Sequence, residues 1–142
     1  MLYADAVGER GEMMFYVAAT GFHGDKPIFR PRQLGGKWPL ADFVVELVGR
    51  PGMFFLVQVK ATTRGYLSGG SRLNTTADAR KLRALASAPL PTYVAGVDER
   101  AGDVFIAPLC DEDAFSPGVA AKHDLGDPAV RRRLHEDVMA FW

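Results

Sequence analysis

The sequence lacks several features that define whole classes of proteins. Cys110 is the only cysteine among 142 residues, which excludes an internal disulfide and any cysteine-based zinc site. No apolar run approaches the roughly 20 residues that a membrane span needs, and the opening residues are too few and too polar for a secretory signal. We therefore expect a protein that makes no membrane contact and has a cytoplasmic location.

Two common kinds of functional site are also missing. His23, His123 and His135 lack the His-x-x-x-His spacing of a zinc site, and residues 68–71 lack the Gly-Lys-Ser/Thr ending of a phosphate-binding loop. Net charge is zero, which argues against non-specific nucleic-acid binding through a large overall positive charge.

Charge is nevertheless distributed unevenly along the chain. Residues 20–90 hold eleven Lys/Arg against four Asp/Glu, whereas residues 91–142 hold five against ten. A basic middle segment can present a local positive face where phosphate contacts concentrate. Uneven charge in a small domain also arises by chance, so the sequence leaves both interpretations open.

Apolar periodicity, capping residues and turn signals predict one domain of the mixed α/β (α+β) class. Helices are predicted over 5–20, from 75 or 76 to 87, and from 128 onward; strands over 41–48, 53–62, 92–97 and 104–109; and loops over 23–39 and 63–74. In the first helix, a spacing of about 100° per residue puts Glu9 and Glu12 on a polar face opposite Met13, Met14 and Val17. The order of elements predicts a central mixed sheet flanked by helices.

Gln58-Val59-Lys60, near the end of an apolar strand, is the most informative segment. Alternate side chains of a strand share a face, so Gln58 and Lys60 lie side by side. A lysine on so apolar a strand is costly unless it is used. Asp42, sixteen residues before Gln58, faces Gln58 or Lys60 if a hairpin loop of three or five residues joins the strands, and faces Val59 if the loop has four.

Such a cluster would suit a metal ion and a phosphate. The Asp42 carboxylate is a hard oxygen ligand for Mg²⁺ or Mn²⁺. The Gln58 side-chain carbonyl and the Val59 backbone carbonyl would be further ligands, and Glu12 would complete the shell directly or through water. Lys60 would orient the attacking water or stabilise charge on the phosphate.

These residues follow one another as in the PD-(D/E)XK nuclease superfamily, which the chain resembles over about residues 5–90. Gly8 to Glu12 is similar to the Gly-x-x-x-Glu helix opening of the Holliday-junction-resolvase branch, and the string VQVKAT resembles a Gln-x-Lys variant of uncharacterised bacterial families. The resemblance implies a restriction-endonuclease-like core, Mg²⁺-dependent cleavage of DNA in processing, repair or defence, and a homodimer as one form of assembly. It assigns metal and catalytic roles to Glu12, Asp42, Gln58 and Lys60.

The sequence also departs from that family. Gln58 stands where the family more often has Glu, which removes one negative charge from the metal shell, and Pro39 is not adjacent to Asp42. A catalytically inactive module that binds nucleic acid or a protein partner is therefore the second hypothesis. In a third, the chain is a small structural or interaction protein in which the Gln-Val-Lys string is accidental and Lys60 is a strand-end lysine with its amine in water. Separately, Glu9 competes with Glu12 for the helix role.

Phosphate contacts are expected from basic residues in the two predicted loops, namely Arg30, Arg32, Lys37, Arg64 and Arg72. Arg64 and Arg72 flank Tyr66, a pairing of cation and aromatic ring suited to a nucleic-acid strand. Two further expectations concern structural residues. Cys110 is predicted to be a small buried side chain, and residues 131–133 are predicted to form a solvated helix face.

Overall fold

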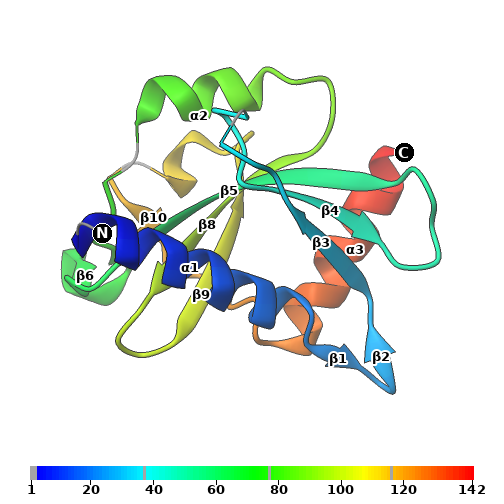
Figure 1. Ribbon diagram of the computed structural model, residues 1–142, viewed down its shortest axis with the longest axis horizontal. Coiled ribbons are helices and arrows are strands. Elements are labelled where there is room, and N and C mark those ends of the chain that lie inside the picture. The colour runs from blue at the N-terminus through cyan, green and yellow to red at the C-terminus, as the bar shows by residue number, and fades with distance from the viewer. Residues whose placement is uncertain (1–2, 37, 77, 116) are drawn as a thin grey trace.

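The computed structural model describes residues 3–36, 38–76, 78–115 and 117–142, in which three helices surround a five-stranded mixed sheet (Figure 1). The helices are α1 (Tyr3–Ala19), α2 (Ala79–Ala86) and α3 (Pro128–Phe141). The central strands are β3 (Phe29–Gln33), β4 (Phe43–Leu47), β5 (Phe54–Thr62), β8 (Thr92–Asp98) and β9 (Asp103–Pro108). Shorter elements are β1 (Phe22–His23), β2 (Lys26–Pro27), β6 (Tyr66–Leu67), β7 (Arg72–Leu73), β10 (Val119–Ala120), and the 3₁₀ turns Ser68–Gly70 and Glu112–Ala114. The predicted mixed α/β class is confirmed.

The central sheet has the strand order β3-β4-β5-β8-β9. Strands β3, β4 and β5 form an antiparallel meander, β5 and β8 are parallel, and β9 returns antiparallel to β8. Parallel neighbours need a crossover connection, and α2 lies within the segment that joins β5 to β8.

The two faces of the sheet are buried by different helices (Figure 1). On one face, Phe15 of α1 packs on Phe43 of β4 with ring centroids 5.0 Å apart, and α3 adds Leu134 and Val138. On the other face, α2 contributes Leu82 and Leu85, which are buried with residues of β8, β9 and β10. Alternation along each strand supplies both cores, because successive side chains point to opposite faces.

The prediction of a loop over 23–39 was wrong, since β1, β2 and β3 all lie there. Pro31 lies in β3, an edge strand of the sheet. Even-numbered positions of β3 and its flanks bond to β4, as the pairs Leu34–Asp42 and Ile28–Val48 show. Pro31 therefore faces the open edge, where its missing N–H breaks no ladder bond. The loop predicted over 63–74 was likewise wrong in part, because β6 and β7 form there.

The helix predictions need two corrections. Neither Thr75 nor Thr76 caps α2. Asp78 does so, accepting hydrogen bonds from the backbone N–H groups of Arg80 and Lys81. Of the predicted apolar face of α1, Met14 packs against the core, whereas Met13 is 52% and Val17 71% exposed. The buried face consists of Gly11, Phe15 and Ala19. The prediction followed the large apolar side chains, but the small residues Gly11 and Ala19 allow the helix to pack closely on the sheet.

Candidate functional site

The β4–β5 hairpin brings Asp42 level with Gln58. The strands pair Phe43 with Val57 and Val44 with Leu56, and the Leu47 N–H donates to Met53 O at 2.9 Å, so 48–52 form the connection. Those five residues are an odd number, which keeps even-numbered positions of the two strands on one face. The register therefore does not separate Asp42 from the side of β5 that carries Gln58 and Lys60.

Asp42 is bonded to the main chain of β5 on both sides of Gln58. Its N–H donates to Val57 O at 2.9 Å, and its Oδ2 accepts the Val59 N–H at 2.7 Å. Because β4 begins only at Phe43, the carboxylate takes the place of a ladder partner for Val59. This arrangement fixes one carboxylate oxygen and the position of the side chain.

Gln58 holds a polar atom that has no partner among the described residues. Its side chain is only 6% exposed, and its Oε1 is buried without a hydrogen bond. A buried amide oxygen without a partner costs about 1–3 kcal/mol. Lys60, two positions further, is half-buried and lies opposite Gly96 of β8. A bound cation, or a ligand that donated a hydrogen bond to the Gln58 oxygen, would satisfy this acceptor.

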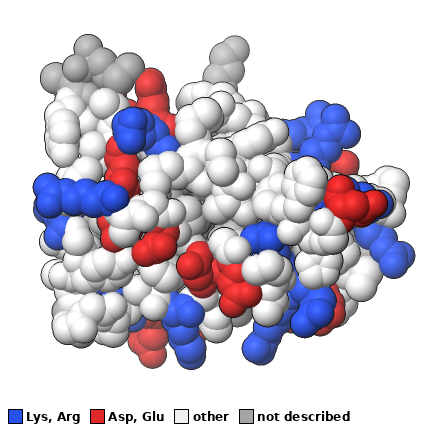
Figure 2. All heavy atoms as spheres, turned by 90° about the horizontal axis from the view of Figure 1, so that it is seen from below, with Lys and Arg blue, Asp and Glu red and all other residues white. Residues whose placement is uncertain are grey.

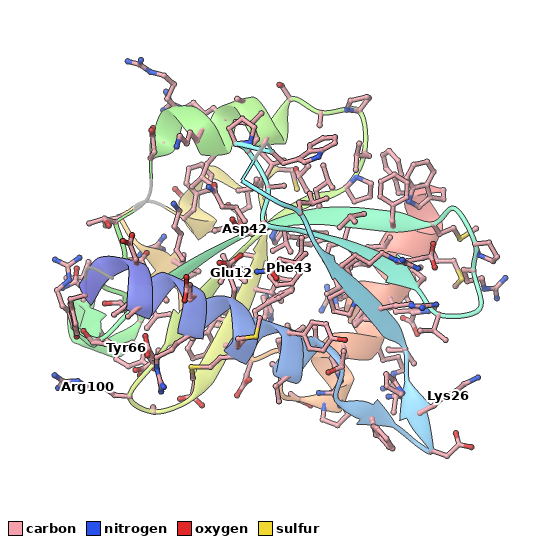
Figure 3. All side chains as sticks on the ribbon, in the orientation of Figure 1. Glu12, Lys26, Asp42, Phe43, Tyr66 and Arg100 are labelled. Carbon is pink, nitrogen blue, oxygen red and sulfur yellow. The ribbon has the colours of Figure 1, made fainter. Side chains whose placement is uncertain are left out.

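Glu12 approaches the same region from α1. Figure 3 shows Glu12 and Asp42 near the centre of the molecule, and the charge of Asp42 contributes to the raised pKa of Glu12. Burial is the main cause of that rise, and a hydrogen bond from Gln33 Nε2 at 3.3 Å opposes it. Glu9 is exposed on the neighbouring turn. Of the two candidate glutamates, Glu12 is the one that the fold brings near Asp42.

The pKa of Asp42 is also raised above its ordinary value. Burial is the largest cause, while the hydrogen bond from Val59 and the charges of Lys60 and Lys81 lower it. Lys81 belongs to the first turn of α2 and was not predicted as a site residue, and neither was Gln33. Spacing along the chain gives no signal for either residue, since each comes from an element brought close only by the tertiary fold.

Chemically, the site offers two carboxylates, one unpartnered amide oxygen and two ammonium groups. No group of three or more His, Cys, Asp or Glu side chains that could hold a metal occurs among the described residues. The donors that remain are hard oxygens, which favour Mg²⁺ or Mn²⁺ over Zn²⁺. The backbone carbonyl of Val59 stays a predicted ligand.

The residues predicted to contact phosphate have different surroundings. Arg30 and Arg32 are exposed on β3, and Arg64 is exposed in the segment after β5. Lys37 lies outside the described residues. Arg72 donates to the backbone carbonyls of residues 113, 117 and 118, so its guanidinium fastens two segments of the chain. We correct its assignment accordingly and leave it out of the nucleic-acid surface.

Charge on the surface is mixed rather than of one sign. In Figure 2, acidic side chains gather in the middle of the face seen from below, and basic side chains lie around them. This face is therefore not a broad positive surface, and phosphate contacts would depend on local groups of cations.

Two structural expectations also need correction. Cys110 is exposed rather than buried. Arg131 is only 4% exposed, and its guanidinium donates to the carbonyls of Phe22, Leu125 and Gly126 at 2.9–3.0 Å. The three carbonyls come from two distant segments, so nothing in the local sequence distinguishes Arg131 from the exposed arginines beside it.

Comparisons of the chain with protein-family models, with curated proteins and with solved structures gave no match. None of the helices in the described part of the chain is long and apolar enough to cross a membrane.

Proposed function

We propose that this protein is a Mg²⁺- or Mn²⁺-dependent phosphodiesterase acting on DNA, of the PD-(D/E)XK nuclease type. One observation carries the proposal. The Val59 N–H fixes the Asp42 carboxylate on β5, and Val59 stands in sequence between Lys60 and Gln58, whose Oε1 is buried without a partner among the described residues. Glu12 adds a second carboxylate from α1, close enough for the two charges to interact.

The order of elements supports this proposal. A helix with Glu12 precedes an antiparallel meander that has Asp42 directly before its second strand and Gln58 with Lys60 on its third. A helix then crosses over to a parallel strand. Helix, Asp, Gln-x-Lys strand and helix follow one another in the order that the sequence resemblance implies.

The donor set fits a hard divalent cation. Asp42, Gln58 and Glu12 would hold it, with the Val59 carbonyl as a further ligand. When bound, the ion would supply neutralisation of phosphate charge and a more acidic water. Lys60 would donate a hydrogen bond to a phosphate oxygen or to the attacking water. Arg30, Arg32 and Arg64 would contact flanking phosphates, since each is exposed.

Cleavage can be tested directly. Purified protein is incubated with single-stranded, double-stranded and branched DNA and with RNA, in Mg²⁺ or Mn²⁺. We expect cleavage that is lost in Lys60→Ala and retained in Lys122→Ala, which removes an exposed lysine elsewhere. If wild type and Lys60→Ala leave every substrate intact, or cleave alike, the proposed activity is refuted.

A second function rests on the composition of the site. Gln58 contributes no charge, and the described residues hold no third acid here. A catalytically inactive module that binds nucleic acid or a protein partner is therefore the alternative proposal. Binding that survives a chelator and Asp42→Ala, without cleavage, would support it. A cytoplasmic location, a role in DNA processing, repair or defence, and a homodimer remain proposals under either function.

Metal binding separates the two functions before any substrate is known. Calorimetric titration of Mg²⁺ or Mn²⁺ into wild type should give saturable binding that disappears in Asp42→Ala. Binding that is equal in both proteins would place the ion elsewhere and would count against the catalytic proposal.

A further inference from the structure

A groove at the open edge of the sheet is lined by the last turns of α1, the β1–β2 hairpin and β3. Figure 1 shows these elements next to one another. Its volume is about 410 Å³. Tyr16 of α1 and Phe22 of β1 contribute aromatic rings, while Lys26 and Arg30 contribute cations. Pro31 forms part of its wall on the edge strand.

Both aromatic residues are uncovered. Tyr16 is 44% and Phe22 65% exposed, although an aromatic side chain of this size usually gains free energy by burial. Exposed rings beside cations are the elements of a single-strand binding surface, on which bases stack and phosphates meet positive charge. Paired bases in a duplex already stack on one another, so this surface favours an unpaired strand.

The charges in the groove have one sign. Lys26 and Arg30 line it, and no carboxylate does so among the described residues. Arg30 lies opposite the acidic Glu46 across the β3–β4 pair, so replacing Arg30 would also change its interaction with Glu46. Replacing Lys26 is therefore the better test of attraction to phosphate. This local positive character complements a phosphate backbone.

The groove ends close to the carboxylate site along the chain, with Tyr16 and Pro31 as its nearest lining residues. Tyr16 is one helical turn beyond Glu12, about 6 Å along α1 on the same face. On the opposite wall, β3 extends from Phe29 to Gln33, whose side chain donates to Glu12. A strand bound in the groove and continued past Tyr16 would run towards Glu12 and Asp42.

We propose that this groove binds a single-stranded segment of nucleic acid, stacking bases on Tyr16 and Phe22 and holding phosphates at Lys26 and Arg30. The binding itself stands independently of catalysis. Delivery of the strand to Glu12 and Asp42 rests on the proposed function.

Fluorescence anisotropy tests the binding in EDTA, where cleavage does not interfere. A short labelled oligothymidylate is titrated with protein, alongside a duplex of equal length. We expect tighter binding of the single strand and a loss of about 5- to 100-fold in affinity for Phe22→Ala and for Tyr16→Ala. Tyr16→Phe should retain most of the affinity, because the ring remains.

Salt dependence tests the charge. Lys26→Gln should reduce the slope of log affinity against log salt by about 0.7, the value for one phosphate contact on a single strand. Two controls match the variants outside the groove. Phe141→Ala removes a ring that is 53% exposed, and Lys122→Gln removes an exposed cation. Both should bind as wild type does.

Three results would overturn the inference. The first is no binding of the oligothymidylate by wild type; the second is equal affinity in the groove variants and the controls; the third is occupation of the groove by a protein segment that the oligonucleotide does not displace. Loss of cleavage with intact binding would refute only the proposed hydrolysis, so the two proposals fail separately.

Discussion

The methyl group of Ala61 on β5 occupies the space that a side chain at Gly11 of α1 would need. This close approach of helix and strand holds the neighbouring Glu12 at the sheet. Gly8, one turn earlier, has open space around its Cα. Gly8 and Gly11 thus have different structural roles, although any glycine inside a helix lowers its intrinsic stability.

Replacing these glycines should have opposite effects. Gly11→Ala forces α1 away from β5 and should lower the free energy of unfolding by about 1–3 kcal/mol through overpacking. Gly8 is exposed in the same helix, so Gly8→Ala should raise the free energy of unfolding by about 0.5–1 kcal/mol. Denaturant unfolding of both variants measures the difference. Equal effects of the two changes would show that helix propensity, not contact with Ala61, decides the outcome.

Gln58→Met tests whether the amide oxygen serves a bound ion. Removing a buried oxygen without a partner should raise the stability of the metal-free protein by about 1 kcal/mol. Added Mn²⁺ should stabilise wild type but not the variant, measured by the shift in Tm. Thr75→Val is the matched control, since Thr75 Oγ1 is also buried without a partner. It should keep the Mn²⁺ response, and a full response in Gln58→Met would contradict the site.

The pH dependence of stability should report on Asp42. Because burial raises the pKa of Asp42 above 3.8, the folded protein holds this proton to higher pH than the unfolded chain does. The resulting stabilisation is present below pH 3.8 and is lost as pH rises through the raised pKa. Asp42→Asn cannot ionise and keeps an oxygen acceptor for Val59.

Stability of Asp42→Asn should therefore decline less than that of wild type across this window. Denaturant unfolding at a series of pH values measures the difference between the two proteins. The difference also contains the part of the Glu12 contribution that depends on Asp42, because burial raises the pKa of Glu12 and the charge of Asp42 raises it further. Parallel pH profiles would mean that Asp42 ionises alike in the folded and unfolded chain.

Arg131→Met should destabilise the fold strongly. The variant leaves the carbonyls of Phe22, Leu125 and Gly126 without their shared donor, at a cost of roughly 3 kcal/mol. Arg132→Met changes an exposed neighbour and should alter stability by no more than about 0.5 kcal/mol. Thermal or denaturant unfolding compares the two. Similar losses would show that the guanidinium does not stabilise the junction between its two segments.

Much of the architecture follows from local signals. The alternation around Asp42 and the Gln58-Val59-Lys60 segment predicted a hairpin, and Asp127 followed by Pro128 predicted the start of α3. Strand β3 escaped prediction because Pro31 is tolerated only at an edge, and edge position is a property of the assembled sheet. The start of α2 was misplaced because Thr75 and Thr76 are equally good caps by type.

The sequence by itself determined the mixed α/β class and the alternation that puts Gln58 and Lys60 on one face of a strand, because strand periodicity is a local property. The pairing register that brings Asp42 level with Gln58 was open in the sequence and was decided by the structure. Only the tertiary structure decided which face of α1 is buried, since Gly11 meets Ala61 across a separation of fifty residues. It also brought Gln33 and Lys81 to the carboxylates, buried Arg131, and formed the groove beside β3. These relationships depend on contacts between distant segments, for which the spacing of residues along the chain holds no signal.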